Sequence, residues 1–412
     1  MDAQVVQEHV AKTAFEVENS TTAHPQPLAN KDFAVQMEQL HIDDNNSSFP
    51  ADATPSAEQT AMSQANVEAD KKSSTMVEVR STDTMGLGLF ATQDIPRGTR
   101  ILSEEPLIHL PDPVYRRDLI KGFCNKAMKL SRDQIECLSR LHCDPEMLKK
   151  EDSDIIKKWY QYNSVTDAEG KELKGKKRQE SRKKMLKWFG IFNTNSSRQI
   201  SDNRQEGRGV FCMFSRINHA CVPNARYGWN ETIKRFTVHV NRDVAKDEEI
   251  YVSYIPLFYQ DREERAEELK GWGFECGCKA CRDPASERRW KQMSKCHLLV
   301  ESYIHGDIDI PRALLSTPLR SVKEVLAQLD RLTELMIEEG LVTMELTKMY
   351  RTCSQYCWTS LDDMDKAIEY AEKALEVERC LIGPETEHLR ENYVGCQYWL
   401  AMLKVMKLTA ES

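Results

Sequence analysis

The sequence predicts an α+β protein in which a small β-rich domain is interrupted by helices and followed by a helical C-terminal domain. Alternating apolar and polar residues at 77–89 and 235–254 provide the strand signal. Between them, apolar residues spaced three or four positions apart indicate helices over 113–190. After about residue 290 the spacing is helical to residue 412. The length of 412 residues suits two to three domains.

The first 75 residues differ in composition from the rest. They contain four Lys and twelve Asp or Glu, a charge of −8, with three Phe and neither Trp nor Tyr. Such a segment buries too little apolar surface to offset the entropy lost on ordering. We therefore predict a disordered acidic tail over 1–75. The whole chain also has a formal charge of −8, so the remaining residues are neutral overall and the chain is not a nucleic-acid polycation.

Targeting signals and cysteine usage exclude several classes of protein. The start, Met1–Glu8, lacks the basic and apolar regions of a secretory signal, and no apolar run is long enough to span a membrane. The 13 cysteines are odd in number and come without such a signal. We therefore predict thiols or metal ligands rather than a disulfide framework, and a reducing compartment: nucleus, cytoplasm or both.

The β-rich domain is predicted from five short segments. Strands are expected at 77–79 and 87–89, and the segment Asp94–Gly98 contains the proline and glycine of a turn. Residues 101–108 predict one further short strand. Two more strands are predicted where residues 235–240 alternate strictly and residues 249–254 follow a polar turn.

The C-terminal part has one well-marked helix. Residues 367–375 place apolar side chains on one helical face, and Ser360 with Asp363 has the spacing of a capping box before it. Gly383-Pro384 ends this helix, and the spacing over 393–400 suits another. An Ala-rich helix followed by a second helix resembles a tetratricopeptide unit, although a single unit does not establish an array.

The first motif is Gly86-Leu-Gly88-Leu-Phe-Ala91, which matches one form of the dinucleotide-binding fingerprint. That interpretation requires a helix to begin at the last glycine. Pro96 and Gly98 follow too closely for such a helix. The motif is therefore not a dinucleotide-binding fingerprint. Taken alone, it is a glycine-rich hairpin between two strands or part of another kind of binding site.

Three further motifs follow. The first covers residues 216–224, Arg-Ile-Asn-His-Ala-Cys-Val-Pro-Asn, and taken alone it can be explained as a turn with a buried histidine. The second covers residues 247–254, Asp-Glu-Glu-Ile-Tyr-Val-Ser-Tyr, and taken alone it can be explained as the edge of a strand. The third motif places three cysteines within six residues, a spacing that brings their sulfurs onto one cation: Cys276, Cys278 and Cys281. Structural zinc takes four ligands. The candidates for the fourth are Cys221, Cys296 and His297.

In this order the four motifs resemble those of SET-domain protein lysine methyltransferases, over roughly residues 76–284. The resemblance implies a β-rich SET fold over 76–254 with a helical insert at about 112–200. It further implies a zinc-bound post-SET segment at 255–284 and a helical, tetratricopeptide-like domain at 290–412. The helical end is similar to the SET-and-MYND branch and to fungal SET proteins akin to it. The insert has no MYND zinc finger, because its cysteines lack paired spacing: Cys124, Cys137 and Cys143.

The resemblance implies methyl transfer from S-adenosyl-L-methionine to the amine of a protein lysine. Tyr254 would be the catalytic residue and would also contact the cofactor. The other cofactor-binding residues implied are Gly86, Gly88, Asn218, His219 and Phe274. The glycines would let the backbone approach the cofactor. Cys221 would join Cys276, Cys278 and Cys281 on a structural zinc ion.

Two residues depart from the family pattern. Ala220 stands where the central motif usually has serine, and Trp272 stands where the SET-and-MYND branch often has a second active-site tyrosine. The second change bears on how many methyl groups are added. Both keep open an alternative, a non-catalytic SET-fold scaffold that binds partners through its helical domain.

Residues 171–187 contain nine Lys or Arg and two Glu, a local charge of +7. The stretch is a solvated helix or loop, a nuclear import signal at 174–184, or a contact for nucleic acid or an acidic chromatin surface. For the whole protein we expect a monomer with a protein substrate, either histone or non-histone, and no membrane partner.

Overall fold

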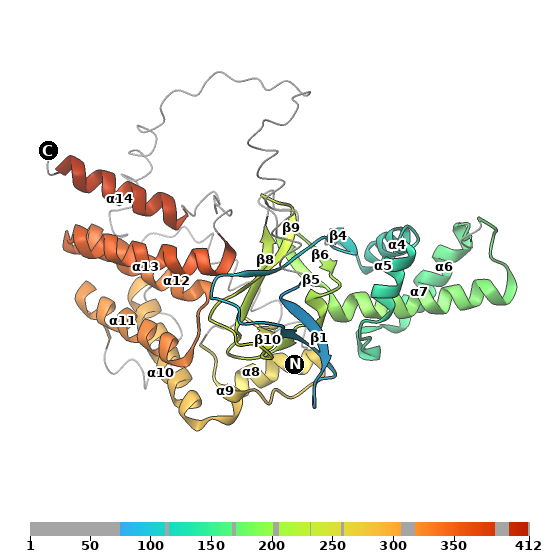
Figure 1. Ribbon diagram of the computed structural model, residues 1–412, viewed down its shortest axis with the longest axis horizontal. Helices are drawn as coiled ribbons and strands as arrows, with labels where there is room; N and C mark the ends of the chain where they lie inside the picture. The colour runs from blue at the N-terminus through green and yellow to red at the C-terminus, as the bar shows by residue number, and fades with distance from the viewer. Residues whose placement is uncertain are drawn as a thin grey trace, which may run out of the picture. The chain divides into compact units, whose positions relative to one another are not determined.

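The computed structural model describes residues 75–111, 115–166, 170–200, 206–230, 232–256, 259–305, 318–383 and 395–410 (Figure 1). All of them lie within one compact unit. Apart from Thr75, the predicted acidic tail falls outside the described residues. None of the helices in the described ranges combines the length and apolar character needed to cross a bilayer.

The β-rich part consists of three small sheets. Its strands are β1 (Val77–Ser81), β2 (Leu87–Ala91), β3 (Arg100–Glu104), β4 (Ile108–Pro111), β5 (Ser197–Ile200), β6 (Glu206–Val210), β7 (Asn218–His219), β8 (Ala225–Asn230), β9 (Arg235–Val240) and β10 (Glu249–Val252). The sheet orders are β1-β2-β10-β7, β3-β9-β8 and β4-β6-β5. The predicted α+β class with a β-rich part is confirmed.

Strand β10 joins motifs that lie far apart in the sequence. It pairs antiparallel with β2, where Ile250 lies opposite Leu89. On its other edge it pairs parallel with β7, where Val252 lies opposite His219. The glycine motif, the Asn-His motif and the residues after β10 therefore meet at one end of this sheet.

The insert between β4 and β5 is helical, as predicted. It contains α4 (Arg116–Ala127), α5 (Arg132–Ser139), the short η1 (Pro145–Met147), α6 (Lys150–Tyr162) and α7 (Gly175–Asn195). Its core is aromatic: Phe123 contacts Phe189 and Phe192 with ring centroids 5.3 and 5.4 Å apart. The last residues of the predicted insert, 197–200, are not helical but form β5.

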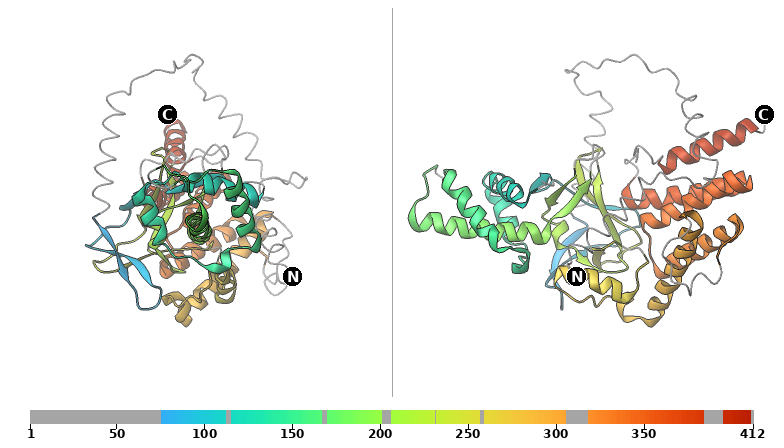
Figure 2. Two further views of the ribbon diagram at one scale, coloured as in Figure 1. Left: turned by 90° about the vertical axis from the view of Figure 1, so that its right-hand side faces the viewer. Right: turned by 180° about the vertical axis from the view of Figure 1, so that it is seen from behind.

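The C-terminal region is helical, again as predicted. Three short elements lead into it: α8 (Arg262–Leu269), η3 (Lys270–Trp272) and α9 (Lys279–Arg282). The short η2 (Phe214–Arg216) lies earlier, between β6 and β7. The C-terminal region comprises α10 (Pro284–His305), α11 (Val322–Glu339), α12 (Met344–Leu361), α13 (Met364–Ile382) and α14 (Cys396–Ala410). The views of Figures 1 and 2 agree that α10–α14 and α4–α7 lie on opposite sides of the strands.

Two local predictions were wrong. Residues 101–108 form two strands in different sheets, because Pro106 lacks an N–H and restricts the residue before it. The capping box at Ser360 was also misplaced. Ser360 lies inside α12, and the N-cap of α13 is Asp363, whose carboxylate accepts from the Lys366 N–H. Of the second predicted helix, Tyr393 falls outside the described residues.

One disulfide departs from the prediction that the cysteines are thiols or metal ligands. Cys137 on α5 is bonded to Cys212, 75 residues later and just after β6. The insert packs against the β4-β6-β5 sheet, which brings the two Cα atoms to 6.1 Å. This is a single cross-link rather than a framework, since the other eleven cysteines, all within the described residues, form no disulfide.

Candidate active site

A cavity of about 980 Å³ lies where β2, β7 and the segment after β10 meet. Its volume is at the upper end of the range for small-molecule sites. Among its lining residues are Gly86, Asn218, His219, Tyr254 and Phe274. The structure thus brings five of the six predicted cofactor and catalytic residues to one cavity.

Tyr254 is held at the wall of this cavity by a hydrogen bond and by aromatic neighbours. Its hydroxyl donates to the carbonyl oxygen of Ile217 at 2.6 Å. Its ring lies 4.9 Å from that of Trp272 and 6.3 Å from that of Phe274, centroid to centroid. Burial, and then the nearby Tyr227 and Glu249, raise the pKa of Tyr254 above its usual value. The hydroxyl is therefore protonated at neutral pH and serves as a donor.

His219 connects this tyrosine with the cysteine motif. Its Nδ1 accepts from the backbone N–H of Tyr254 at 3.0 Å, so a neutral ring carries its proton on Nε2. Nε2 lies 3.5 Å from the sulfur of Cys221. Burial lowers the pKa of His219 to about 4, which keeps the ring neutral near pH 7.

The two glycines of the first motif are needed for different structural reasons. Gly86 has φ +77°, a conformation that residues with a side chain rarely adopt. Gly88 lies against the carboxylate of Glu249, with which a Cβ at this position would collide. Gly88 is absent from the cavity lining. Its smallness makes room for Glu249, and its predicted contact with the cofactor stays a prediction.

Glu249 holds Asn218 in place. One carboxylate oxygen accepts from Asn218 Nδ2 at 2.7 Å, and the other accepts from the Tyr251 hydroxyl at 2.6 Å. Asn218 Nδ2 also donates to the carbonyl oxygen of Leu87 at 3.2 Å. The side chain of Asn218 is thereby tied to both β2 and β10.

Asn224, the last residue of the central motif, fastens that motif to β10. Its Nδ2 donates to the carbonyl oxygen of Glu249 at 2.8 Å, and its Oδ1 accepts from the Tyr251 N–H at 2.7 Å. The side chain is 1% exposed. A buried amide satisfied on both sides fixes the strand that leads to Tyr254.

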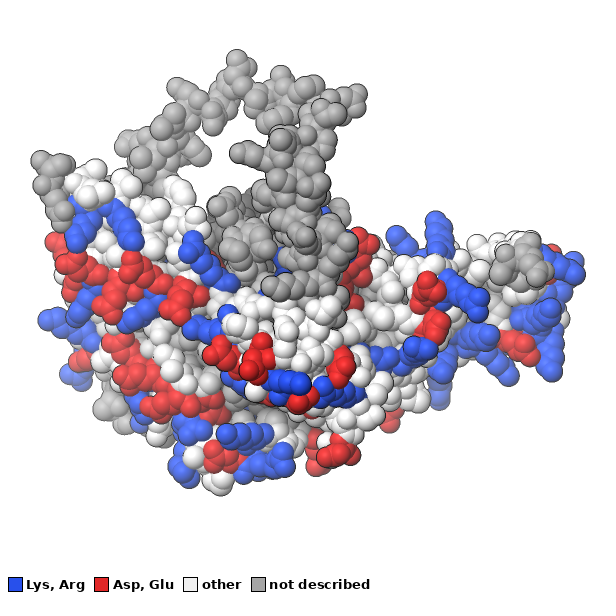
Figure 3. All heavy atoms as spheres, viewed as in Figure 1, with Lys and Arg blue, Asp and Glu red and all other residues white. Residues whose placement is uncertain are grey.

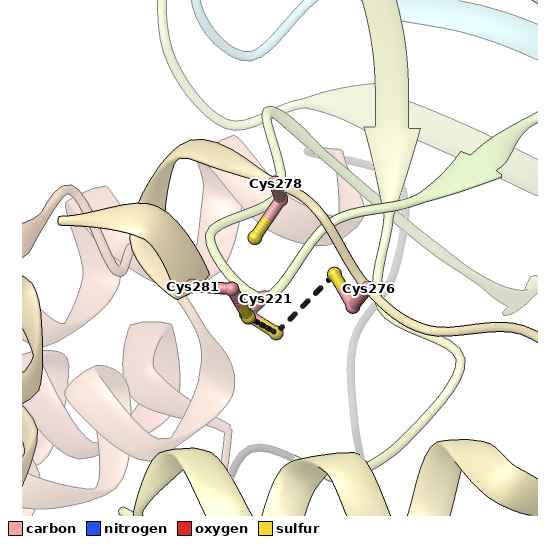
Figure 4. A group of neighbouring side chains, drawn as sticks. All are labelled: Cys221, Cys276, Cys278 and Cys281. Carbon is pink, nitrogen blue, oxygen red and sulfur yellow. Dashed lines mark hydrogen bonds between the residues drawn. The ribbon is translucent and has the colours of Figure 1, made fainter. Parts of the chain in front are cut away.

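The four cysteines of the predicted metal site lie together. The sulfurs of Cys221, Cys276, Cys278 and Cys281 are all within 4.8 Å of one another and point toward a common centre (Figure 4). The Cys221 sulfur lies 3.9 Å from that of Cys276 and 3.5 Å from that of Cys281. Tetrahedral zinc with Zn–S of about 2.3 Å requires sulfurs roughly 3.8 Å apart. The donor set therefore fits zinc, and the other fourth-ligand candidates, Cys296 and His297, are not in this group.

A buried arginine accompanies the cysteine group. Arg265 on α8 is 0% exposed, and its guanidinium lies 4.2 Å from the ring centroid of Trp290. Nη1 donates to the carbonyl oxygen of Gln260, whereas Nε and Nη2 have no hydrogen-bond partner among the described residues. Burial lowers its pKa, but the sulfurs of Cys221 and Cys281 outweigh this and raise the pKa overall. A buried cation suits a group of thiolates, whose four charges exceed those of one zinc ion.

The cavity also has a basic side. Its lining includes Arg140, Lys187, Arg198 and Arg216, and among the described residues it contains no Asp or Glu. Arg216 donates to the carbonyl oxygen of Arg140 at 2.9 Å. Burial, and then the charge of Arg140, lower its pKa. Trp272, which is 38% exposed, contributes an apolar side chain to the same cavity.

Sequence patterns did not single out Glu249 or Arg265. Glu249 lies within a predicted motif, and its alternation with Tyr251 would have placed both on one face of β10. Arg265 carries no sequence signal, because α8 reads as a charged, solvated helix: Arg-Glu-Glu-Arg-Ala-Glu-Glu-Leu.

Comparisons with known proteins agree with this geometry. The family model of the SET domain matches residues 86–255. The chain is 24% identical over 302 residues to the histone-lysine N-methyltransferase set5 of Schizosaccharomyces pombe, covering 73% of this chain and 77% of that protein. It is 33% identical to the human protein-lysine N-trimethyltransferase SMYD5, but over only 20% of either chain. The crystal structure of the SET domain of LSMT bound to lysine and AdoHcy matches at 14% identity over 86% of this chain and 93% of that one, with a TM-score of 0.29.

The strand arrangement and the motifs around the cavity define a SET-domain protein, and the matched region contains all of those motifs except the three-cysteine group. Residues 86–255 form a SET domain, and the chain is similar to protein-lysine methyltransferases of the fungal SET5 type and to SMYD5.

Proposed function

We propose that this protein transfers a methyl group from S-adenosyl-L-methionine to a lysine side chain of a histone or of another nuclear or cytoplasmic protein. The observation that carries the proposal is the meeting of Gly86, Asn218, His219 and Tyr254 at one cavity. S-adenosyl-L-methionine supplies the methyl group on a sulfonium. Gly86, Asn218 and His219 would bind the donor, and Phe274 offers a ring on which its adenine can stack.

The protein's own contribution is positioning and desolvation. Two reactants held in line gain up to ~7–11 kcal/mol over the reaction in solution. The hydroxyl of Tyr254 is protonated and anchored on the Ile217 carbonyl, so it is a polar group of fixed orientation on a residue that lines the cavity. It is suited to orienting the reacting groups and does not act as a base.

The lysine amine must enter as the neutral form, although its usual pKa is about 10.4. Aromatic walls from Tyr254, Trp272 and Phe274 disfavour the ammonium form by desolvation. Arg216, Arg140 and Lys187 add positive charge on the same cavity, which lowers the pKa of an entering amine further. No general base is therefore needed.

Transfer of radiolabel tests the proposal directly. Purified protein is incubated with labelled S-adenosyl-L-methionine and either core histones or a whole-cell extract. We expect label in protein, and the labelled band identifies the substrate class. The alternative of a non-catalytic scaffold draws on Ala220 and Trp272. Absence of label from both substrates, in a folded preparation that binds the donor, would favour that alternative.

Glu249 provides a test of the donor site. Replacing Glu249 by alanine removes the acceptor that holds Asn218, so we expect KM for S-adenosyl-L-methionine to rise about 10- to 100-fold with little change in kcat. Glu249→Gln keeps an acceptor oxygen and should recover most of the affinity. Glu376→Ala is the matched control, because the Glu376 carboxylate on α13 pairs with Arg97 at 2.8 Å and does not line the cavity. An effect on kcat alone, or equal effects of the two alanine variants, would contradict this role.

We further propose that zinc binds the four cysteines and is structural. The segment from Cys276 to Cys281 is then pinned to Cys221, which lies two residues after His219. Phe274, just before this segment, would be held over the cavity by the same metal.

We propose a nuclear location for at least part of the protein, with residues 174–184 as the import signal. Neutralising residues 176–178 and 182–184 in a fluorescently tagged protein should shift it from the nucleus to the cytoplasm. An unchanged nuclear signal would refute the import role. The same stretch is proposed to contact chromatin.

A further inference from the structure

The exposed side of α7 carries five lysines: Lys176, Lys177, Lys183, Lys184 and Lys187, here called the lysine face. All five are exposed. At 100° per residue they fall within an arc of about 120°, which also holds one acid, Glu180. From Lys176 to Lys187 the face extends about 16 Å along the helix axis.

The opposite side of α7 is committed to the core of the insert. Met185 and Phe189 are buried there. Arg178 also points inward, since its guanidinium donates to the carbonyl oxygens of Tyr160 and Asn163. The lysine face is therefore fixed in orientation by packing behind it.

The lysines of this face are not neutralised by neighbours. In the described part of the chain, no ion pair involves any of them. Four lysines of the C-terminal helices, by contrast, pair with carboxylates at up to 4.0 Å: Lys366 with Asp363, Lys373 with Glu369, Lys404 with Glu372, and Lys407 with Asp365. Lysines paired with carboxylates are enough to keep a surface soluble. The unpaired lysines gathered on α7 are therefore available to bind an external anion.

The charge is also concentrated regionally. Residues 115–200 contain 21 Lys or Arg and 12 Asp or Glu, a charge of +9, whereas the remainder of the chain carries −17. Figure 3 shows basic side chains gathered over the end of the molecule that carries α6 and α7. Lys187, at one end of the lysine face, lines the active-site cavity.

We propose that the lysine face binds the phosphate backbone of duplex nucleic acid, independently of sequence, and so leads a nucleic-acid-bound substrate to the cavity. This names the chemistry of the chromatin contact proposed above. Nucleic acid presents closely and evenly spaced charges, which lysines meet as point charges without fixed geometry. Over residues 176–187 the arc contains only charged side chains, the five lysines and Glu180, and so lacks the apolar centre of a protein–protein interface. A phosphate backbone therefore suits this face better than a protein surface does.

The test measures binding of a fluorescein-labelled 20-base-pair DNA duplex by anisotropy at salt concentrations between 50 and 200 mM. Five phosphate contacts predict a slope of log K against log salt of about −4.5. Changing Lys176, Lys177, Lys183 and Lys184 to glutamine should weaken binding at least about 30-fold at 50 mM salt and reduce the slope by about 3.6. The matched control changes Lys366, Lys373, Lys404 and Lys407 to glutamine, which removes the same charge, and should bind as the unmodified protein does.

Three outcomes would overturn the inference. These are absence of duplex binding, equal loss in the two quadruple variants, and equal or tighter binding of poly-glutamate of the same charge, which would assign the face to an acidic protein. Binding is measured without S-adenosyl-L-methionine and is repeated on Tyr254→Phe. A failure of the proposed methyl transfer therefore leaves this result unaffected, and the reverse also holds.

Discussion

Replacing Tyr254 by phenylalanine is expected to lower kcat for methyl transfer about 100-fold or more, with a smaller effect on KM for the donor. The substitution removes only the hydroxyl, which is anchored on the Ile217 carbonyl within the cavity. The ring and its contacts with Trp272 and Phe274 remain. The measurement is steady-state kinetics with the substrate that radiolabelling identifies.

Tyr370→Phe is the matched control for this prediction. The Tyr370 hydroxyl donates to Asp330 at 2.6 Å, the same distance as in Tyr254, but lies between α11 and α13 in the helical region. Each variant loses one short hydrogen bond, worth roughly 1 kcal/mol of stability. Activity should be retained in Tyr370→Phe. Full activity in Tyr254→Phe would remove the tyrosine from the mechanism.

Changing Cys278 to serine is expected to lower bound zinc from about one ion per chain to near zero and to abolish most of the activity. Structural zinc stabilises small metal sites by about 10–16 kcal/mol, and loss of one thiolate leaves Arg265 beside an incomplete ligand set. Elemental analysis of the purified variant measures the metal, and donor binding measures whether the segment with Phe274 still closes the cavity.

Cys296→Ser is the control for the metal prediction. Cys296 is buried on α10 and lies outside the group of four sulfurs. It should keep its zinc. A zinc-free Cys278→Ser protein with full activity would show that the metal does not support the active site.

How far the sequence predicts this site depends on how local each feature is. The motifs at Gly86, Asn218 and Tyr254 are short and contiguous, so they can be recognised before their meeting place is known. The break at Pro106 was missed, although proline's restriction on its own backbone and on the residue before it is a local signal. The cysteine group was predictable because three of its four members lie within six residues.

The features that escaped prediction depend on distant contacts. Gly88 needs to be small because of Glu249, some 160 residues later, and Glu249 in turn serves Asn218. In the sequence, Arg265 is one of several charged residues on a polar helix. In the structure, α8 packs it beside Trp290 and the cysteine sulfurs. The pairing of Cys137 with Cys212 follows from how the insert settles on its sheet. None of these partners has a fixed spacing in the sequence.

The central position of β10 also constrains how the protein is made. Ile250 pairs with Leu89, so 161 residues must leave the ribosome after one strand before the other arrives. At roughly 5–20 residues per second this delay is about 8–30 s, during which β2 has β1 as its neighbour and an open edge on the other side. Pairing over such a separation is slow to nucleate and exposes the nascent chain to association with others. A stalled chain that ends before residue 249 would possess the glycine and Asn-His motifs and still lack the strand that joins them.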